Sequence, residues 1–501
     1  MSRVRPVSLG SRLEKGALLA VATALTLSLA ACGSQLDPGT VSQLNGGDTG
    51  AQAGTVAGGG TVPGTTTDGG TTTGGGTTTG GGTTTGGGTT TTGGGTTTGG
   101  GTTTGGGTTG GGGGDNSATG GEKGASCDGF KNGPGVTDDK IVIGNSSDIS
   151  GPVPGLFEQS QDAVRAYVAY FNSTSDICGR KLELKSYDSR TDAGADQQAY
   201  ADGCDNVFAM VGSMSAFDSG GASTAQSCGL PDIRSASVTS ERSSCTTCFG
   251  VQSANSREYE NAVPDFIMKN YGGGQHAAML YTNAGAAAEN GKAQAALMTK
   301  RGMHFDYIQG IDVSEFNYAP YVQAMKDKGI QTVQFIAAPS LFVRLAQAMK
   351  QQGFTPKLYL LDPSAYDPDY VSQGGSDVDG TVVFTNFVPF EEASSNNEMQ
   401  LYLSWLQQVK PGAQPGFFGV FSWSAARLFV EQAAKLGGKL SRATMVDAIK
   451  GVDNWTANGM HSPQRVGPKR VGDCWRFIQL NDGKWGPVGG SKYQCNGTTT
   501  Y

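Results

Sequence analysis

The stretch Lys140-Ile-Val-Ile-Gly144 is a short apolar run, and Ser147-Asp-Ile-Ser-Gly-Pro152 follows it closely. From Phe157 to Asn172 the apolar residues then recur every three or four positions. A short apolar run followed by an amphipathic segment predicts a strand that leads into a helix. This βα unit sets the pattern for the rest of the chain.

The same alternation continues downstream. Strands are expected at residues 181–187, 207–212, 276–281, 332–337 and 357–361, and helices at 193–204, 261–270, 291–301, 318–328 and 341–352. Short strands alternating with longer helices favour parallel sheets covered on both faces. About 375 residues have ordinary composition, whereas a single core stops growing near ~250–300 residues. The sequence therefore predicts an α/β protein with two doubly wound lobes.

The N-terminal sequence is typical of an export signal. Four basic residues and one acid lie among the first fifteen, and an apolar run spans residues 16–29. This pattern predicts a signal peptide at residues 1–31, and the run is shorter than the ~20 residues of a membrane-spanning helix. Leu29-Ala-Ala-Cys32 resembles a bacterial lipobox, which implies cleavage before Cys32 and lipidation of its thiol. An ordinary signal peptide with an incidental cysteine is the alternative.

Residues 32–124 are rich in Gly and Thr, and residues 65–109 consist almost entirely of these two types. Such a segment has too few apolar residues to offset the entropy cost of ordering. A disordered tether is therefore predicted, with a reach of roughly 50–55 Å for about 90 residues. O-glycosylation of the threonines is compatible with this reading.

Charge argues against nucleic acid as a partner. The whole chain has a formal net charge of −7, and removing residues 1–31, which carry four bases and one acid, makes it −10. An acidic protein gains nothing from the phosphate backbone.

Eight cysteines follow Cys32, and an even number in an exported chain indicates disulfides. They are Cys127, Cys178, Cys204, Cys228, Cys245, Cys248, Cys474 and Cys495. Cys245 and Cys248 form a CxxC pair, but no second pair stands at a spacing that would complete a zinc site. Their Ser and Thr neighbours favour a structural disulfide over a redox motif. A Cys204–Cys228 bridge is a further expectation, and no metal site is predicted.

Several landmarks along residues 137–487 carry a family resemblance. They are Ile141-Val-Ile-Gly with Ser150-Gly-Pro, Leu182-Glu-Leu with Tyr187-Asp188, Val211-Gly-Ser-Met-Ser, Leu230-Pro-Asp-Ile, Tyr281-Thr-Asn and Ser422-Trp-Ser-Ala-Ala. In this order and spacing they resemble the branched-chain amino-acid-binding family of ABC-transporter substrate-binding lipoproteins, which has the type I periplasmic-binding-protein fold. The resemblance implies a small-molecule ligand, a membrane permease as partner, no cofactor, and a monomer anchored to the outer face of the cell membrane through Cys32.

The resemblance also implies the domain plan. Lobe 1 is expected at residues 125–255 and 387–458, and lobe 2 at residues 256–386 and 459–501. Three crossover segments near Asn255, Asn386 and Asn458 would join the lobes. Ligand binding between the lobes would close the cleft by a hinge motion.

Ligand-binding residues are expected in the loops after the strands. In lobe 1 these are Phe157, Ser213, Ser215, Phe217, Ser237 and Thr239, and in lobe 2 they are Thr282, Asn283, Pro339 and Asp362. Short hydroxyl side chains and free backbone N–H groups at a helix start bind carboxylates well. The same Ser and Thr residues also suit N-caps.

Two of these residues have a second reading. Asp362 would pair with a ligand ammonium group, but it also begins an Asp-Pro pair that is typical of turns. Phe157 stands where the family places an aromatic near the mouth of the cleft, and it also suits the first core position of its helix.

The sequence departs from the family at the ligand loops. Ala216-Phe217 follows Ser215 where amino-acid binders carry a run of Ser, and residues 284–288 are mostly Ala where they place an aromatic. The expected ligand is therefore a small polar molecule, and it belongs to one of three classes: amino acids, amides or small organic acids.

Enzyme motifs are not found. The three histidines, His276, His304 and His461, share no metal-ligand spacing, and the sequence has no HExxH, Walker loop or Gly-x-Ser-x-Gly elbow. A binding protein is predicted rather than an enzyme. A sensing receptor of the same fold and a structural cell-envelope lipoprotein are the alternatives.

Overall fold

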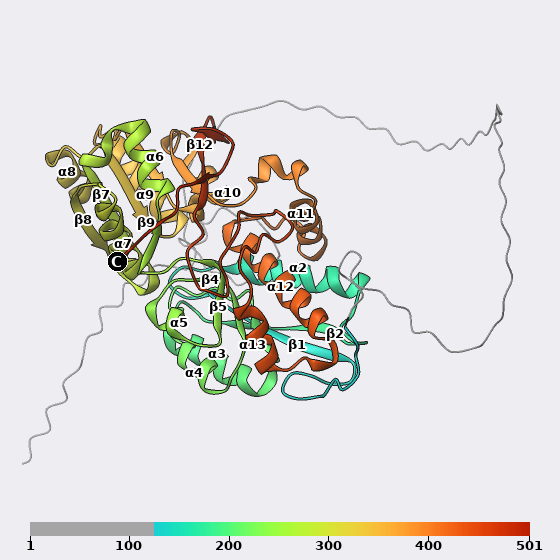
Figure 1. Cartoon of the computed structure of the whole chain (residues 1–501). Helices are drawn as coiled ribbons and strands as arrows, with labels where there is room; N and C mark the ends of the chain where they lie inside the picture. The colour runs from blue at the N-terminus through green and yellow to red at the C-terminus, as the bar shows by residue number, and fades with distance from the viewer. Residues whose placement is uncertain (1–124) are drawn as a thin grey trace, which may run out of the picture. The chain divides into compact units, whose positions relative to one another are not determined.

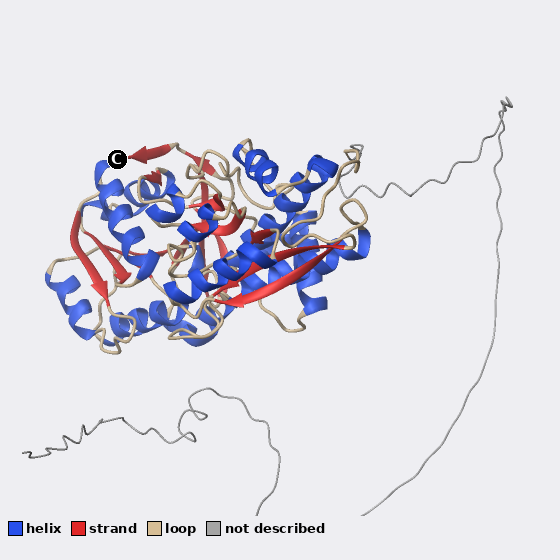
Figure 2. Ribbon diagram, turned by 90° about the horizontal axis from the view of Figure 1, so that it is seen from below, coloured by secondary structure: helices blue, strands red, loops and turns tan. Residues whose placement is uncertain are grey.

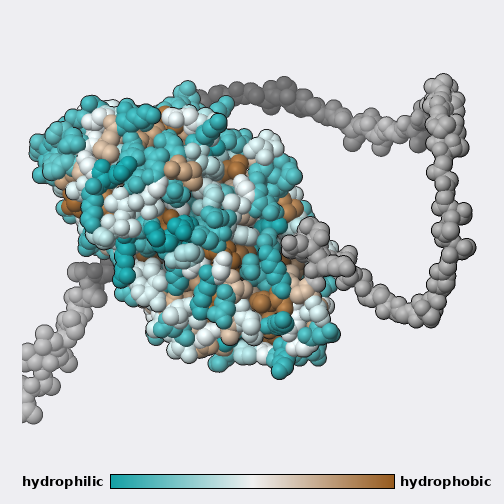
Figure 3. Space-filling view, in the orientation of Figure 1, coloured by the Kyte–Doolittle hydropathy of each residue, from teal (hydrophilic) through white to brown (hydrophobic). Residues whose placement is uncertain are grey.

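The computed structural model describes residues 125–501, which form two α/β lobes (Figure 1). The expected signal peptide at 1–31, the lipidation site Cys32 and the tether at 32–124 lie outside the described residues. Within residues 125–501, no helix is both long and apolar enough to cross a membrane. The face seen in Figure 3 is largely hydrophilic, with hydrophobic residues in small patches.

The first lobe is built on a parallel sheet of five strands in the order β2-β1-β3-β4-β5. The strands are β1 (Lys140–Ser147), β2 (Lys181–Asp188), β3 (Ala209–Val211), β4 (Asp232–Ser237) and β5 (Cys248–Ser253). Ile141, Ile143 and Ile233 are fully buried in this sheet. Central parallel strands are apolar because helices cover both of their faces.

Helices from two parts of the chain cover this sheet. They are α2 (Glu158–Thr174), α3 (Ala193–Asn206), α4 (Ala222–Ser227) and α5 (Ser240–Ser244), followed much later by α11 (Asn397–Val409), α12 (Phe417–Leu436) and α13 (Arg442–Lys450). Figure 1 shows α2 and α12 on one side of the sheet and α3 and α4 on the other. Because α12 packs against both α2 and β4, its Phe421, Trp423 and Leu428 are fully buried.

The second lobe is built on a mixed sheet in the order β13-β12-β11-β10-β9-β7-β8. Its strands are β7 (Ala277–Thr282), β8 (Phe305–Ile311), β9 (Thr332–Ile336), β10 (Leu358–Leu361), β11 (Val382–Thr385), β12 (Cys474–Asn481) and β13 (Lys484–Val488). Strands β7 to β11 run parallel, and β12 and β13 add an antiparallel edge. In Figure 2 helices flank the strands of each lobe.

The remaining elements belong mostly to the second lobe. Its helices are α6 (Ala262–Tyr271), α7 (Gly285–Lys300), α8 (Ala319–Asp327), α9 (Pro339–Gln351) and α10 (Pro368–Gly374). The short strand β6 (Glu258–Glu260) pairs with β15 (Thr498–Thr500), and β14 (Gln494–Cys495) pairs with β12. Short 3-10 helices span Gly273–Gln275, Pro363–Ala365, Gly375–Asp377, Phe390–Ser395 and Gly437–Lys439.

The chain passes between the two sheets after β5, after β11 and between α13 and β12. A β-bridge between Phe387 and His461 joins the second and third passages. His461 is buried there, stacks on Phe421 and lies 2.8 Å from the Ser424 hydroxyl through its Nε2 atom. Burial lowers the pKa of His461 to about 4, so its ring is neutral at pH 7.

Gly212 allows the close packing behind the first ligand loop. Its φ of +66° lies in the left-handed region, and an added Cβ would come within 2.4 Å of Val164 on α2. Gly avoids both penalties because it has no Cβ. The chain can therefore turn sharply from β3 beneath α2 and α12.

Four disulfides join the eight cysteines of the described residues. They are Cys127–Cys178, Cys204–Cys228, Cys245–Cys248 and Cys474–Cys495. The Cys204–Cys228 bridge is the pairing expected from the sequence, and the CxxC cysteines bond to each other. Cys245 and Cys248 are both buried, which suits a structural role.

Some element boundaries differ from those predicted. The strand expected at 207–212 is only β3, because the Val207 N–H still bonds to Gly203 of the preceding helix. Helix α7 starts at Gly285 and not at 291, since the Ala-rich segment 284–288 is mostly helical. Strand β8 and the antiparallel hairpin of β12 and β13 were not predicted.

Candidate functional site

A cavity of about 590 Å³ lies between the two lobes. Its walls include residues 214–217 after β3, Thr282 at the end of β7 and Asp362 after β10. The carboxyl ends of parallel strands bring such loops together. Most of the lining is apolar and a few polar groups interrupt it, as in small-molecule sites.

Hydrogen bonds join the two lobes around this cavity. They run from Ala286 N to Ala216 O (2.9 Å), from Ser240 N to Glu289 Oε1 (3.0 Å) and from Gln159 Nε2 to Asp367 Oδ2 (3.1 Å). Each pairs one residue of the first lobe with one of the second. The structure is therefore a form in which the lobes meet over the cavity.

Six of the ten residues singled out in the sequence line the cavity. They are Phe157, Ser215, Phe217, Thr282, Pro339 and Asp362. Phe157 is nearly buried and packs edge-on against Phe418 of α12, with ring centroids 4.7 Å apart. It also forms a small apolar cluster with Met214 and Ala236, which line the cavity as well.

The other four residues lie outside the lining. Ser213 is fully buried, and its hydroxyl accepts a hydrogen bond from the Ser146 N–H. Ser237 is buried at the end of β4, and Thr239 caps α5 by accepting from the Arg242 N–H. The Asn283 N–H bonds to Ile311 of the neighbouring strand.

A buried carboxylate occupies the donors of the first loop. Asp148, which is fully buried, accepts from the Ala216 N–H and the Thr191 N–H, both at 2.8 Å, and from the Ser189 hydroxyl at 2.6 Å. The Ser215 hydroxyl lies 3.4 Å from the same carboxylate and accepts from the Phe217 N–H. These loop donors are already engaged within lobe 1.

A second buried carboxylate occupies the other loop. Asp218 is fully buried, and its Oδ2 atom accepts from the Val238 N–H at 2.9 Å and the Thr239 N–H at 3.5 Å. The backbone amides at the start of α5 thus face an aspartate of the protein itself. They match the anion-binding arrangement expected from the sequence, but an internal anion fills it.

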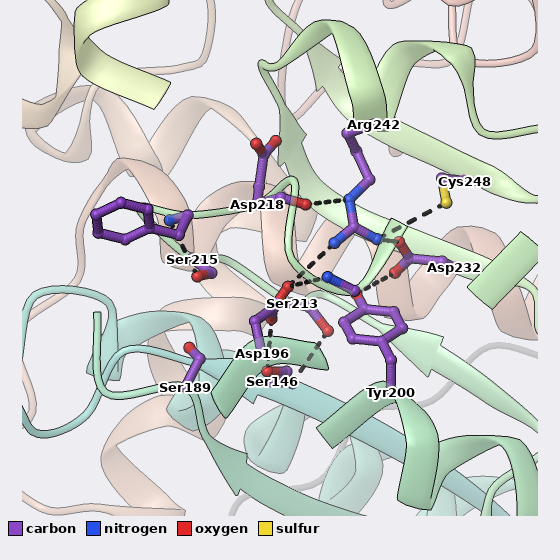
Figure 4. Close-up of polar contacts among 12 residues, drawn as sticks. Ser146, Ser189, Asp196, Tyr200, Ser213, Ser215, Asp218, Asp232, Arg242 and Cys248 are labelled. Atoms are coloured by element: carbon purple, nitrogen blue, oxygen red, sulfur yellow. Dashed lines mark hydrogen bonds and ion pairs between the residues drawn. The ribbon is translucent and has the colours of Figure 1, made fainter. Parts of the chain in front are cut away.

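A polar network lies behind these loops (Figure 4). The Arg242 guanidinium is fully buried and donates to Asp232 at 2.7 Å, to Asp196 at 3.1 Å and to the carbonyl of Asp218. Asp232 also accepts from the Tyr200 hydroxyl at 2.8 Å. A buried charge this well paired holds the loops in place, because each ion has several partners.

The opposite wall of the cavity, formed by the second lobe, contains a buried acid without a cation partner within residues 125–501. Glu260 on β6 is 4% exposed and lines the cavity, yet no cation of the described residues forms an ion pair with it. Burial raises the pKa of Glu260 to about 8, and the nearby Glu258 adds to the rise. The buried hydroxyl of Thr282, which also lines the cavity, has no hydrogen-bond partner in the described part of the chain.

Asp362 lies on the same wall and is partly exposed to the cavity. Burial raises the pKa of Asp362 to about 6, although the Ser364 N–H and hydroxyl both donate to it. Its field also acts on Tyr259, together with that of Glu260. Two carboxyl groups and one phenol thus share a wall without a compensating cation.

Several lining residues had not been singled out in the sequence. They include Gln159, Tyr259, Glu260, Lys410, Phe418 and Trp475. Glu258-Tyr-Glu260 stands in a crossover segment, and an acidic pair around an aromatic residue in a hinge was the available signal. Trp475 follows Cys474 on the antiparallel strand β12, whose position gave no such signal.

The described residues contain no cluster of three or more His, Cys, Asp or Glu side chains that could hold a metal ion. His276 and His304 both contact Asp306, and none of the three lines the cavity.

Two α/β lobes, several connections between them and a cavity at the strand ends define a two-lobed binding protein. The family described as periplasmic binding protein matches residues 140–484, so the chain belongs to that family. The family and the fold predicted from the sequence are thereby confirmed. A search of curated protein sequences gives no match.

Solved structures agree on the fold. A fatty-acid ABC transporter substrate-binding protein from Thermomonospora curvata is 18% identical with a TM-score of 0.63, over 74% of this chain and 97% of that one. A leucine-binding protein from Thermotoga maritima is 14% identical with a TM-score of 0.60, over 72% and 99%. An isoleucine complex of a substrate-binding protein from Streptococcus pneumoniae is 13% identical with a TM-score of 0.59, over 71% and 99%.

Proposed function

We propose that the chain is an extracytoplasmic solute-binding lipoprotein of an ABC importer. A small polar ligand would bind in the cavity between the lobes and be handed to a membrane permease. The cavity between the lobes, with walls from both of them, is the observation that carries this proposal. No catalytic step is needed for this role, and a monomer suffices for it.

The similar structures support a small organic ligand. Their described ligands include isoleucine and 4-hydroxybenzoate, and one similar protein is a fatty-acid transporter component. Amino acids, amides and small organic acids are therefore the first classes to test. The ligand-contact set would include Phe157, Ser215, Phe217, Thr282 and Asp362, which line the cavity.

The domain plan belongs to the same proposal. Residues 1–31 would be cleaved, Cys32 would carry the lipid, and residues 32–124 would act as a tether. Lobe 1 would comprise residues 125–255 and 387–458, and lobe 2 residues 256–386 and 459–501. The contacts between Ala216 and Ala286 and between Gln159 and Asp367 would form on closure and break on opening.

Calorimetry and solution scattering test this function together. The full chain is titrated with a panel of amino acids, amides, amines, organic acids and sugars, and scattering is recorded with and without each. A ligand at a hundredfold excess over its Kd adds about 2.7 kcal/mol of stability, so melting temperature gives a second readout. We expect one chemical class to bind and to make the protein more compact. Absence of binding by every class, or binding without a change in compactness, would refute the hinge-closing receptor.

A further inference from the structure

The cavity between the lobes has a marked charge imbalance. Seven of its lining side chains are carboxylic acids and one, Lys410, is a base. The acids are Glu158, Asp162, Glu258, Glu260, Asp362, Asp367 and Asp369. Lys410 is not available to a ligand anion, because it already bonds to Glu158 at 2.8 Å and to Asp162 at 2.7 Å.

Three backbone amides in the loops of the first lobe are not available either. Asp148 takes the Ala216 N–H, and Asp218 takes those of Val238 and Thr239. Both aspartates are fully buried. A ligand carboxylate entering here would lose its hydration and meet no free donor among these amides, which is a costly arrangement.

The second lobe offers the opposite chemistry. Glu258 is satisfied by Arg470 and by the Thr498 hydroxyl, whereas Glu260 beside it has no cation. Asp362 adds a second carboxyl group on this wall, and helix α7 contributes the neutral side chains of Asn290 and Gln294. An ammonium group would find two carboxyl partners here.

We propose that the cavity binds a primary amine that has an apolar body and no carboxylate. The ammonium group pairs with Glu260 and Asp362, and the body packs against Phe157, Met214 and Phe418 of lobe 1. This inference rests on the proposed solute-binding function and narrows its ligand class. It also accounts for the unpartnered hydroxyl of Thr282, which lines the cavity and can accept a hydrogen bond from the ammonium group.

The test uses four compounds that share one apolar body and differ only in the polar end. These are 2-phenylethylamine, 3-phenylpropanoate, 3-phenylpropanamide and phenylalanine, with a second set built on a four-carbon chain. Calorimetry on the full chain at pH 7.5 should show the amine of at least one set binding ten times or more tightly than its carboxylate and amino-acid partners. Intrinsic tryptophan fluorescence gives an independent readout, because Trp475, one of the five tryptophans, lines the cavity.

Variants locate the ammonium group. Glu260→Gln and Asp362→Asn should each weaken amine binding tenfold or more, since each removes one carboxylate from the wall. Asp306→Asn is the matched control, because Asp306 pairs with His276 and His304 and does not line the cavity. The control should bind the amine like the parent protein.

The pH dependence separates the amine from a neutral ligand. Glu260, beside Glu258 and Tyr259, ionises mostly near pH 8, so amine affinity should rise between pH 6 and pH 8. A neutral amide held by protonated Glu260 would instead bind more weakly as the pH rises over this range. A ligand affinity that falls in this way overturns the proposal. Tighter binding of a carboxylate than of its matched amine also overturns it, while leaving the solute-binding function intact. Binding by no compound in either this set or the wider panel counts against both.

Discussion

The two walls of the cavity use the same chemical group in opposite ways. In lobe 1, Asp148 and Asp218 are buried against backbone amides, and Asp232 is buried against Arg242 and Tyr200. In lobe 2, Glu260 is equally buried but has no cation partner. Several donors stabilise a buried carboxylate, whereas burial raises the pKa of Glu260, so ionising it is costly unless a ligand supplies a positive charge.

This difference suggests a division of labour between the lobes. The first lobe supplies donors to its own loop carboxylates, although Gln159 Oε1 and Thr191 Oγ1 on its side of the cavity have no partner among the described residues. The second lobe keeps polar groups unsatisfied at positions that line the cavity. Substitutions of charged residues on the two walls should therefore change the stability of the protein in opposite directions. Changes in the same direction would contradict this difference between the lobes.

The largest effect is expected for Glu260→Gln, which should stabilise the protein without ligand. The pKa of Glu260 is raised in the folded state, so its carboxyl contributes stability that is present below about pH 4.5 and is lost as pH rises through about 8. A shift from 4.5 to about 8 corresponds to at most about 5 kcal/mol. Denaturant unfolding at pH 5 and pH 9 should show this loss in the parent and not in the variant. Parallel pH profiles for the two proteins would mean that Glu260 is not an unpaired buried acid.

Arg242→Met should have the next largest effect, in the opposite direction. It leaves Asp196 and Asp232 buried without their shared cation, and breaking such a network costs about 3–5 kcal/mol. Arg301→Met is the control, since Arg301 pairs with Asp265 at the surface, where an ion pair contributes about 0–1 kcal/mol. Urea midpoints measure both. Equal losses for the two variants would show that the lobe 1 network does not stabilise the fold.

Much of the fold could be predicted from the sequence, because strand and helix periods are local. Strands β7, β9 and β10 lie within one residue of their predicted limits, since each is a short buried apolar run. The antiparallel strand β12 is more difficult, because its partner β11 lies about 90 residues earlier in the chain. A pairing over that distance leaves no local trace in either strand.

The site was predicted less completely than the fold. Loops after strands could be located, so Ser215, Thr282 and Asp362 were placed in the cavity wall. Whether a loop amide is free could not be known, because Asp148 reaches Ala216 from 68 residues away. The expected carboxylate-binding loop is present, but the carboxylate that it binds is the side chain of Asp148.

The smallest of the three expected changes in stability concerns Asp148, whose carboxylate fills that loop. Asp148→Ala should lower stability by about 2 kcal/mol, because the N–H groups of Thr191 and Ala216 and the Ser189 hydroxyl each lose an acceptor. The substitution turns the filled loop of lobe 1 into an open one. If the loop still binds anions after this substitution, a free carboxylate should be able to replace the missing side chain of Asp148.

Acetate provides that replacement. Its carboxylate can accept the same hydrogen bonds, so acetate should raise the melting temperature of Asp148→Ala above that in chloride at equal ionic strength. The parent protein should not respond, because Asp148 already fills the loop. A response by both proteins would mean that acetate acts elsewhere, and a response by neither would mean that the loop does not form an anion site once its aspartate is gone. Selective rescue would show that lobe 1 retains an anion-binding loop and that Asp148 is what closes it to ligands.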